Sequence, residues 1–405
     1  MVENPPLPAS LADAVSVFRG NPFTDNAVAS RARLGRLLLT PPAARAFRGA
    51  LRGSAPFGAE DLVLAVAHAR ASALLEPRRV FGPDVVPDDV LAQLPRSRHD
   101  YASMGFAAAR TFRALQAAPG PSSALCNLRR RGWASAFGAS LIDALDTELL
   151  RRGQPVVICG EAGSGRRTLA RAVLSGVPAP GDRPPWTAPV IAPWDPAAPP
   201  QTSTGGLIVG GLLQRTPVEL AELEAALDRG PGPRLAITCG PWATVAGHLP
   251  RALAARLAPL RLELVPLRDR LEDLDALATS RLVTWGRDLR AAGSPGLDHG
   301  PVLSWFQGAH ARHHDWPGNQ AELEGAVRAL LLGGQPALPA PTRSAPDSSE
   351  PLPGGLAQGT WSDRQVRDWY LQRVHGATGR IGRTARILGL DRSTVRLRLR
   401  QAGLS

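Results

Sequence analysis

The chain of 405 residues carries a formal net charge of +12, and all 47 of its basic residues are arginine. This length predicts roughly two to four domains with sizeable cores, and the basic balance admits nucleic acid or anionic surfaces as partners. The cysteines Cys126, Cys159 and Cys239 have neither metal nor disulfide spacing, which fits a reducing cytosol. We find neither a signal sequence nor a bilayer-spanning apolar run, so we expect a cytoplasmic protein with no membrane partner.

Residues 1–132 are predicted to form a helical N-terminal domain. Three segments carry apolar residues at three-to-four spacing: 27–39, 42–52 and 59–75. We find no catalytic constellation in this region, and we interpret Asp61, His68 and Arg70 as ordinary surface or capping residues. The domain is therefore expected to sense a ligand, dock a protein partner or support oligomerisation.

From about residue 134 the pattern alternates between strands and helices, which predicts an α/β subdomain over 133–266. Strands are expected at 156–159, 188–192, 206–209 and 234–238, with helices at 140–152 and 217–228. This alternation favours a parallel sheet with helices on both faces. Residues 267–332 are predicted to form a helical lid, 333–359 a flexible linker rich in Pro, Ser and Gly, and 360–405 a compact helical module.

A glycine-rich turn follows the first predicted strand and opens a helix. This is the layout of a phosphate-binding loop, in which backbone N–H groups close on phosphate oxygens at a helix N-terminus. The pattern requires Lys after the last glycine, and this chain has Arg instead. The candidate nucleotide-binding residues are Gly160, Gly163, Ser164, Gly165, Arg166 and Arg167.

Several motifs downstream of this loop resemble those of one family. They are Leu264-Val265-Pro266-Leu267-Arg268-Asp269-Arg270, Glu272-Asp273-Leu274 and Trp316-Pro317-Gly318-Asn319 with Glu322-Leu323. In this order they look like the sigma-54-dependent activators, AAA+ ATPases of the NtrC type. The resemblance covers about 134–332, and the C-terminal module is similar to the Fis-type helix-turn-helix of the same family. It implies an AAA+ P-loop core with a helical lid.

The departures from the family pattern fall on its catalytic positions. In the family, an acidic pair holds Mg²⁺ and positions water, and the matching residues here are Gly211 and Leu212. The sensor Asn corresponds to Cys239, the lid Arg to Ala321, and Pro250 replaces the first arginine finger. The segment 168–205 also lacks the family's sigma-54-contacting sequence Gly-Ala-Phe-Thr-Gly-Ala. We therefore predict a degenerate ATPase that neither hydrolyses ATP nor remodels sigma-54.

Two roles remain open for the loop and one for a retained arginine. The loop either binds ATP or another nucleotide without hydrolysis or only caps a helix, and no cofactor is required. Arg256 matches the second arginine finger, so it would act in trans in a non-catalytic subunit of an AAA+ ring. His310, His313 and His314 cluster before Trp316, and His310 and His314 share a helix face; because this pair has no third ligand and no general-base Glu, we predict no metal site.

The last segment has the pattern of a helix-turn-helix, with helices expected at 363–375, 383–388 and 392–402. Gly389 supplies the turn, and Asp391 is suited to cap the third helix. The residues expected to face inward are Ile387, Leu388, Val395 and Leu399. The predicted DNA-binding residues are Arg383, Arg392, Ser393, Thr394, Arg396, Arg398 and Arg400.

In a helix-turn-helix, the N-terminal part of the third helix reaches base edges and later residues meet phosphates. We expect base contacts from Arg392, Ser393 and Arg396, and phosphate contacts from Arg383, Arg398 and Arg400. Residues 361–405 hold ten Arg and three Asp, so +7 of the total charge of +12 lies there. The chain is thus predicted to be a sequence-specific transcription regulator that binds double-stranded DNA as a homodimer or larger homo-oligomer.

Overall fold

The computed structural model describes residues 9–24, 27–39, 58–75, 91–197, 204–229, 232–291, 298–336, 338, 360–378 and 381–401. The chain divides into two compact units, Met1–Ala340 and Pro341–Ser405. The helix expected at 42–52 and most of the linker expected at 333–359 lie outside the described residues.

A five-stranded parallel sheet lies at the centre of the first unit. Its strands run in the order β2-β3-β4-β1-β5. Their bounds are β1 Val156–Cys159, β2 Val190–Pro193, β3 Thr204–Gly210, β4 Arg234–Cys239 and β5 Arg261–Glu263. The predicted α/β class is confirmed. The edge strand β5 was not predicted, because three residues are too few to establish a period of two.

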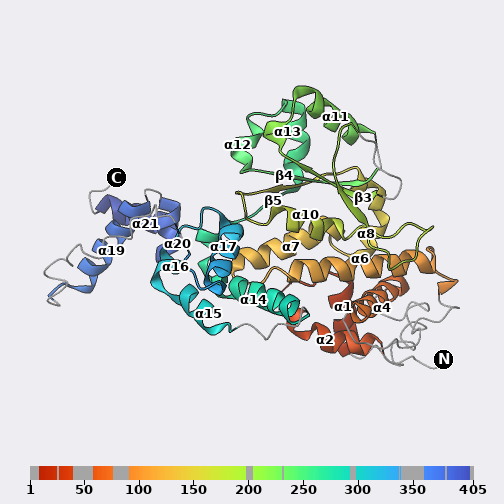
Figure 1. Cartoon of the computed structure of the whole chain (residues 1–405), viewed down its shortest axis with the longest axis horizontal. Helices are drawn as coiled ribbons and strands as arrows, with labels where there is room; N and C mark the ends of the chain where they lie inside the picture. The colour runs from red at the N-terminus through yellow and green to blue at the C-terminus, as the bar shows by residue number, and fades with distance from the viewer. Residues whose placement is uncertain are drawn as a thin grey trace. The chain divides into compact units, whose positions relative to one another are not determined.

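Helices cover both faces of this sheet (Figure 1). On one face lie α11 (Pro217–Asp228), α12 (Trp242–Ala246) and α13 (Arg251–Leu257); on the other lie α10 (Arg166–Leu174) and α7 (Ser123–Phe137). The side chains of β1 alternate accordingly, since Val156 and Ile158 join the core with α10, and Val157 and Cys159 join the core with α11–α13. Short 3₁₀ turns follow β3 and α13 at Leu212–Gln214 and Ala258–Leu260.

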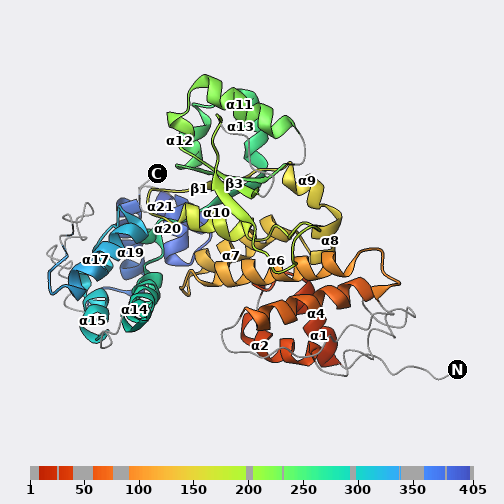
Figure 2. The same ribbon diagram turned by 45° about the vertical axis from the view of Figure 1, so that its right-hand side comes forward.

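Five further helices that precede β1 in the described chain share a core with α7 and the sheet. They are α1 Ala9–Arg19, α2 Ala27–Leu38, α4 Ala59–Leu74, α6 Arg98–Gln116 and α8 Leu141–Asp146, whereas the short α9 Glu148–Arg152 has no buried residue. Figure 2 shows α6 and α7 between the sheet layer and the pair α1 and α4. Apolar side chains of these helices and of α10 form one continuous cluster with β1. The predicted boundary at 132/133 thus falls inside α7.

Two residues of this region differ from the sequence interpretation. His68 is fully buried, not a surface residue, because it stacks on Trp133 and packs edge-on against Phe18. Asp61 is also buried and accepts a hydrogen bond from Arg19 at 2.8 Å.

The helices after β5 have a core of their own. Two 3₁₀ turns, Leu267–Asp269 and Leu271–Asp273, lead into α14 Leu274–Ala291, α15 Gly300–Gln307, α16 Ala309–His313 and α17 Asn319–Leu331. Trp316 is fully buried, stacks on Phe306 and donates its indole N–H to the Ala311 carbonyl at 3.0 Å. None of the helices in the described part of the chain is long and apolar enough to cross a membrane.

The described part of the second unit contains three helices: α19 Asp363–Thr378, α20 Ile381–Leu388 and α21 Arg392–Gln401. Their shared core is formed by Leu371, Ala385, Val395 and Leu399. Ile387 differs from the sequence interpretation, since 52% of it is exposed and Ile381 and Leu390 pack against the core instead.

Candidate functional site

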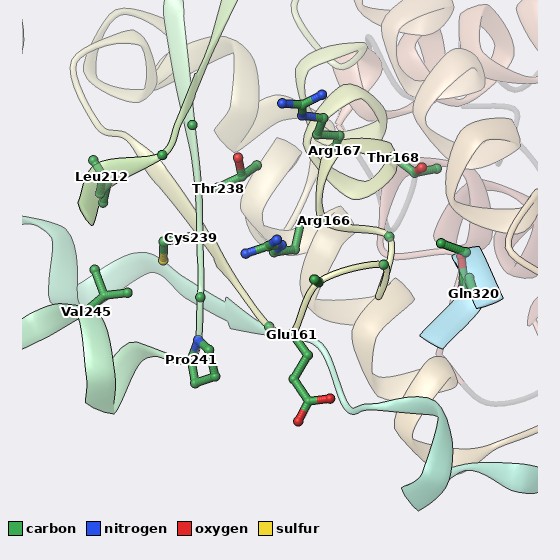
Figure 3. A pocket seen from close by; sticks show the side chains of 18 of the residues that line it. Glu161, Arg166, Arg167, Thr168, Leu212, Thr238, Cys239, Pro241, Val245 and Gln320 are labelled. Atoms are coloured by element: carbon green, nitrogen blue, oxygen red, sulfur yellow. The ribbon is translucent and has the colours of Figure 1, made fainter. Parts of the chain in front are cut away.

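The glycine-rich loop borders a pocket of about 650 Å³ (Figure 3). The pocket lies at the carboxyl ends of the parallel strands, where open α/β sheets bind ligands. It is lined by the loop 160–168, the end of β3 at 210–214, the end of β4 at 238–241, Val245 of α12, and side chains of the lid helices α14 and α17.

The loop adopts a conformation that requires glycine at two positions. Gly163 has φ +73° and Gly165 has φ +101°, in the left-handed region. A Cβ at Gly163 would lie 2.1 Å from the Gly318 carbonyl oxygen. The Gly163 carbonyl in turn accepts a hydrogen bond from the Gln320 backbone N–H at 3.1 Å. The lid therefore packs directly on the loop.

Two arginines occupy the first turn of α10. Arg166 is half-buried and points toward Thr238 and Cys239 at the end of β4, whereas Arg167 is exposed (Figure 3). No acidic residue lies in this first turn. A helix N-terminus already favours negative charge, and two guanidinium groups strengthen that preference. The loop is thus electrostatically suited to an anion.

The acidic side chains that line the described pocket are both engaged. Glu161 receives two hydrogen bonds from Arg268, at 2.5 and 2.7 Å, and these lower the pKa of its carboxyl group. Glu324 pairs with Arg281. At the positions where the family carries its acidic pair, Gly211 takes a left-handed conformation and Leu212 is buried.

Among the described residues, no group of three or more His, Cys, Asp or Glu side chains has the geometry to hold a metal ion. His314, one of the three histidines before Trp316, is buried and bonds through Nε2 to Glu322 at 2.6 Å.

Asn319 connects the loop to the lid, a role that was not predicted. Its side chain is fully buried, its amide nitrogen donates to the Ala162 carbonyl at 3.0 Å, and its amide oxygen accepts from Leu267 N–H at 2.8 Å. Ala321, at the family's lid-arginine position, lines the pocket. The Asn in Trp-Pro-Gly-Asn was the available signal, but sequence spacing alone cannot give its partner 157 residues away.

Arg256, the residue matched to an arginine finger, has partners within the chain. It lies on α13, where it pairs with Asp228 and donates to the Leu227 carbonyl at 2.5 Å. These contacts satisfy the C-terminal end of α11. A role in trans would require Arg256 to leave them.

The second unit contains a tight turn between α20 and α21. Gly389 has φ +63°, and the Leu390 N–H bonds back to the Ala385 carbonyl at 3.0 Å, which closes the C-terminus of α20. Asp391 then caps α21, accepting from the Thr394 N–H at 2.8 Å and its hydroxyl at 2.6 Å. These three hydrogen bonds end α20 and begin α21 on either side of the short turn between them.

The predicted DNA-binding residues lie at different exposures along this motif. Arg392, Arg396 and Arg400 are exposed, and Arg398 is half-buried. Ser393 and Thr394 already donate their hydroxyl hydrogens to Asp391, so in the free protein they are available only as acceptors. Arg383 is in α20, and its side chain is outside the described part of the structure.

An apolar residue stands among these arginines. Leu397 is 58% exposed on α21, while Val395 and Leu399 on either side of it are buried. A leucine here offers a methyl surface beside the guanidinium groups, which is a chemistry that suits the methyl group of thymine.

Comparisons with known proteins give one curated relative and a set of loosely similar structures. No family model matches the chain. It is 28% identical over 292 residues to "Putative transcriptional regulatory protein y4pA" of Sinorhizobium fredii, which covers 62% of this chain and 44% of that protein. The chain thus spans less than half the length of this relative.

The solved structures with which the chain aligns include NtrX from Brucella abortus. The complex with ATP is 17% identical, with a TM-score of 0.37 and coverage of 76% of this chain and 77% of NtrX. The complex with ADP is 16% identical, with a TM-score of 0.39 and coverage of 88% and 80%. TM-scores this low do not assign a role to any residue of this chain. The similarity to a transcriptional regulatory protein comes from the Sinorhizobium fredii relative.

Proposed function

We propose that the chain is a transcription regulator that binds double-stranded DNA through α20 and α21 and carries a P-loop unit that does not hydrolyse ATP. One observation carries the DNA-binding role. A glycine turn and an aspartate cap fix α21 against α20, and exposed Arg392, Arg396 and Arg400 lie along the part of α21 that faces away from the core. The similarity to a curated transcriptional regulatory protein supports the same role.

The P-loop unit supports a scaffolding or relay role better than a catalytic one. ATP hydrolysis at such a loop requires a carboxylate for Mg²⁺ and for the attacking water. The two carboxylates that line the described pocket are paired with Arg268 and Arg281. The segment 168–205 lacks the sequence with which the family it resembles contacts sigma-54. We infer that the unit neither hydrolyses ATP nor remodels sigma-54.

A DNA-binding experiment with three variants tests the first role. We expect Arg392→Ala and Arg396→Ala to weaken binding to selected sites by about 1–3 kcal/mol each, because a base-contacting arginine contributes that much discrimination. Arg364→Ala is the matched control: it removes the same charge from an exposed position on α19, where Arg364 pairs only loosely with Asp368 at 3.8 Å. Sites are selected by mapping bound DNA genome-wide with the full chain and with residues 361–405 deleted. Equal affinities for all three variants would contradict the assignment.

Binding by a single small helix-turn-helix is weak and non-specific. We therefore propose a homodimer or larger homo-oligomer on two-fold symmetric half-sites. The alternative in which the chain is a non-catalytic subunit of an AAA+ ring requires Arg256 to act in trans. Co-purification with an intact ring ATPase, and loss of that ATPase activity on Arg256→Ala, would favour it.

A second candidate function is favoured by the pocket. Its volume of about 650 Å³, the left-handed glycines and Arg166 suit a nucleotide held by its phosphates. We expect calorimetry to give the same dissociation constant for ATP with Mg²⁺ and with EDTA, because both carboxylates that line the described pocket are already paired with arginine. Arg166→Ala is expected to weaken binding about tenfold or more, the effect of losing one charge-assisted contact. Turnover of ATP that is abolished by Arg166→Ala would overturn the non-hydrolysing reading.

A further inference from the structure

Two of the three cysteines of this chain lie side by side at the candidate pocket. Cys159 ends β1 and Cys239 ends β4, and the two residues are partners in the parallel register of these strands. Their sulfur atoms are 3.5 Å apart. Cys126, the third cysteine, is exposed on α7.

The backbone already suits a bond between these sulfurs. Neighbouring strands of a sheet lie about 4.7–4.9 Å apart, and disulfides join Cα atoms about 4.4–6.8 Å apart. The sulfurs would have to approach by about 1.5 Å, because a disulfide bond measures about 2.05 Å. Side-chain rotation with a small strand adjustment supplies a movement of that size.

One of the two thiols has a route to solvent. Cys159 is 1% exposed and Cys239 is 4% exposed, and Cys239 also lines the 650 Å³ pocket. A molecule as small as hydrogen peroxide can therefore approach Cys239 from the pocket, which Cys159 does not line. Cys239 is therefore the thiol that reacts first with the oxidant, and Cys159 is the thiol that then forms the disulfide with it.

The surroundings of Cys239 favour its reactive form. The hydrogen bond between the two thiols, and then the charge of Arg166, which points toward Cys239, lower the pKa of the Cys239 thiol. The same pairing and burial raise the pKa of the Cys159 thiol. The thiolate is the nucleophile in cysteine oxidation, so the two shifts assign the same order as the accessibilities.

We propose that Cys159 and Cys239 form a peroxide-oxidised dithiol that closes to a disulfide between β1 and β4 at the P-loop pocket. The Cys239 thiolate attacks hydrogen peroxide, which breaks the O–O bond and leaves a sulfenic acid and hydroxide. The Cys159 sulfur then attacks the sulfenic sulfur; its proton and the departing hydroxyl leave as water, and the S–S bond forms. In total, two thiols lose two hydrogen atoms and one peroxide becomes two waters.

The disulfide between Cys159 and Cys239 would form next to two residues that line the pocket. Residues Gly160 and Gly240 directly follow the two cysteines, and both line the pocket. Oxidation therefore draws the start of the glycine loop toward the end of β4, whereas reduction by a thiol releases it. The two thiols would react in this way whether or not the chain binds DNA.

Peptide mapping of the full chain tests the proposal. Trypsin places Cys159 in peptide 153–166, Cys239 in 235–251 and Cys126 in 114–129. The Cys126→Ser chain is treated with hydrogen peroxide in the native state, and free thiols are then alkylated. We expect the first two peptides to be joined and to separate on reduction. Cys159→Ser in the same background should stop at a Cys239 sulfenic acid that dimedone traps.

The exposed Cys126 of the unmodified chain reports the oxidant dose. Under treatment that oxidises Cys126, full alkylation of both Cys159 and Cys239 would overturn the proposal and leave them as two small side chains of the core. Dimedone labelling of Cys159 in the Cys239→Ser variant, at the rate of Cys239 labelling in Cys159→Ser, would overturn the assigned order. Cys239→Ala and Cys159→Ala repeat the test in case serine is poorly tolerated at these buried sites.

Discussion

At the scale of single residues, the most unusual environment belongs to Arg31 and His68. Arg31 is 5% exposed, its guanidinium lies over the rings of Phe18 and Phe112 at 4.0 and 4.1 Å, and burial lowers its pKa to about 9. It donates to His68 Nε2 at 2.5 Å, while His68 Nδ1 lies 2.9 Å from the Phe18 carbonyl oxygen. Both contacts are satisfied only by a neutral His68 that is protonated at Nδ1.

A pH dependence of stability follows from this pair. Burial, and then the charge of Arg31, lower the pKa of His68 well below its ordinary value of 6.5. Below pH 6.5, His68 is therefore protonated in the unfolded chain but still neutral in the folded chain. The contribution of His68 to the free energy of unfolding is fully present above pH 6.5. It is lost as the pH falls toward the pKa of the folded state, by at most about 1.4 kcal/mol per pH unit.

Urea unfolding at a series of pH values measures this slope. We expect His68→Phe to be less stable at neutral pH, because it leaves Arg31 without its acceptor, but to lose less on acidification. His248→Gln, which alters an exposed histidine bonded to the Thr244 carbonyl, is the control and should keep the wild-type slope. A wild-type slope in His68→Phe would show that other groups titrate.

At the scale of elements, local chemistry determines α21 more than its composition does. The third helix begins where Asp391 accepts from Thr394 and from Ser393, and these hydrogen bonds lower the pKa of the Asp391 carboxyl group. Only two of its side chains, Val395 and Leu399, are in the buried core of the second unit. A helix of 10 residues with so small a buried face depends on its cap.

Two aspartate variants distinguish the effect of charge on DNA affinity from the effect of the Asp391 cap. If the second unit binds DNA as proposed, removing one of its negative charges strengthens that binding electrostatically, and we expect this for Asp363→Ala in the exposed first turn of α19. Asp391→Ala removes the same charge together with the cap, and we expect it to weaken binding roughly three- to tenfold. Anisotropy titrations of both variants with one duplex compare them. Tighter binding by Asp391→Ala would mean that the cap does not position α21.

The sequence predicted elements best where local chemistry fixes them. Strand 156–159 and helix 217–228 were placed at their observed bounds, the latter because Thr216, Pro217 and Glu219 form a capping box with proline in the first turn. Helix 140–152 was wrong as one element, since it breaks at Thr147 into α8 and α9. The burial of His68 and the hydrogen bonds of Asn319 depend on residues distant in sequence, so no local pattern contains them.

At the scale of the whole molecule, charge is distributed unevenly. The last 45 residues carry ten Arg and three Asp, a charge of +7, which leaves +12 − 7 = +5 for the other 360 residues. An attraction for polyanions is therefore concentrated in the second unit, and it acts through counterion release.

The salt dependence of binding measures how many of these charges meet phosphates. Each phosphate contact contributes about −0.9 to the slope of log affinity against log salt concentration. We expect Arg400→Gln to reduce the steepness by about 0.9 and to weaken binding to all sequences alike. Arg367→Gln on α19, where Arg367 pairs with Asp363 at 3.0 Å, should leave the slope unchanged. A slope that is the same for both variants would place Arg400 away from the DNA backbone.

The contact between Gly163 and Gly318 has a consequence for the recognition of nucleotide sites in other chains. A side chain at position 163 would collide with the lid, so the fold itself demands glycine there whether or not a phosphate is ever bound. The glycine at this position therefore reports the packing of the lid as well as the binding of phosphate. A search that scores the loop alone cannot distinguish a chain that carries an acidic pair after β3 from one that has Gly211 and Leu212 there, as this chain does.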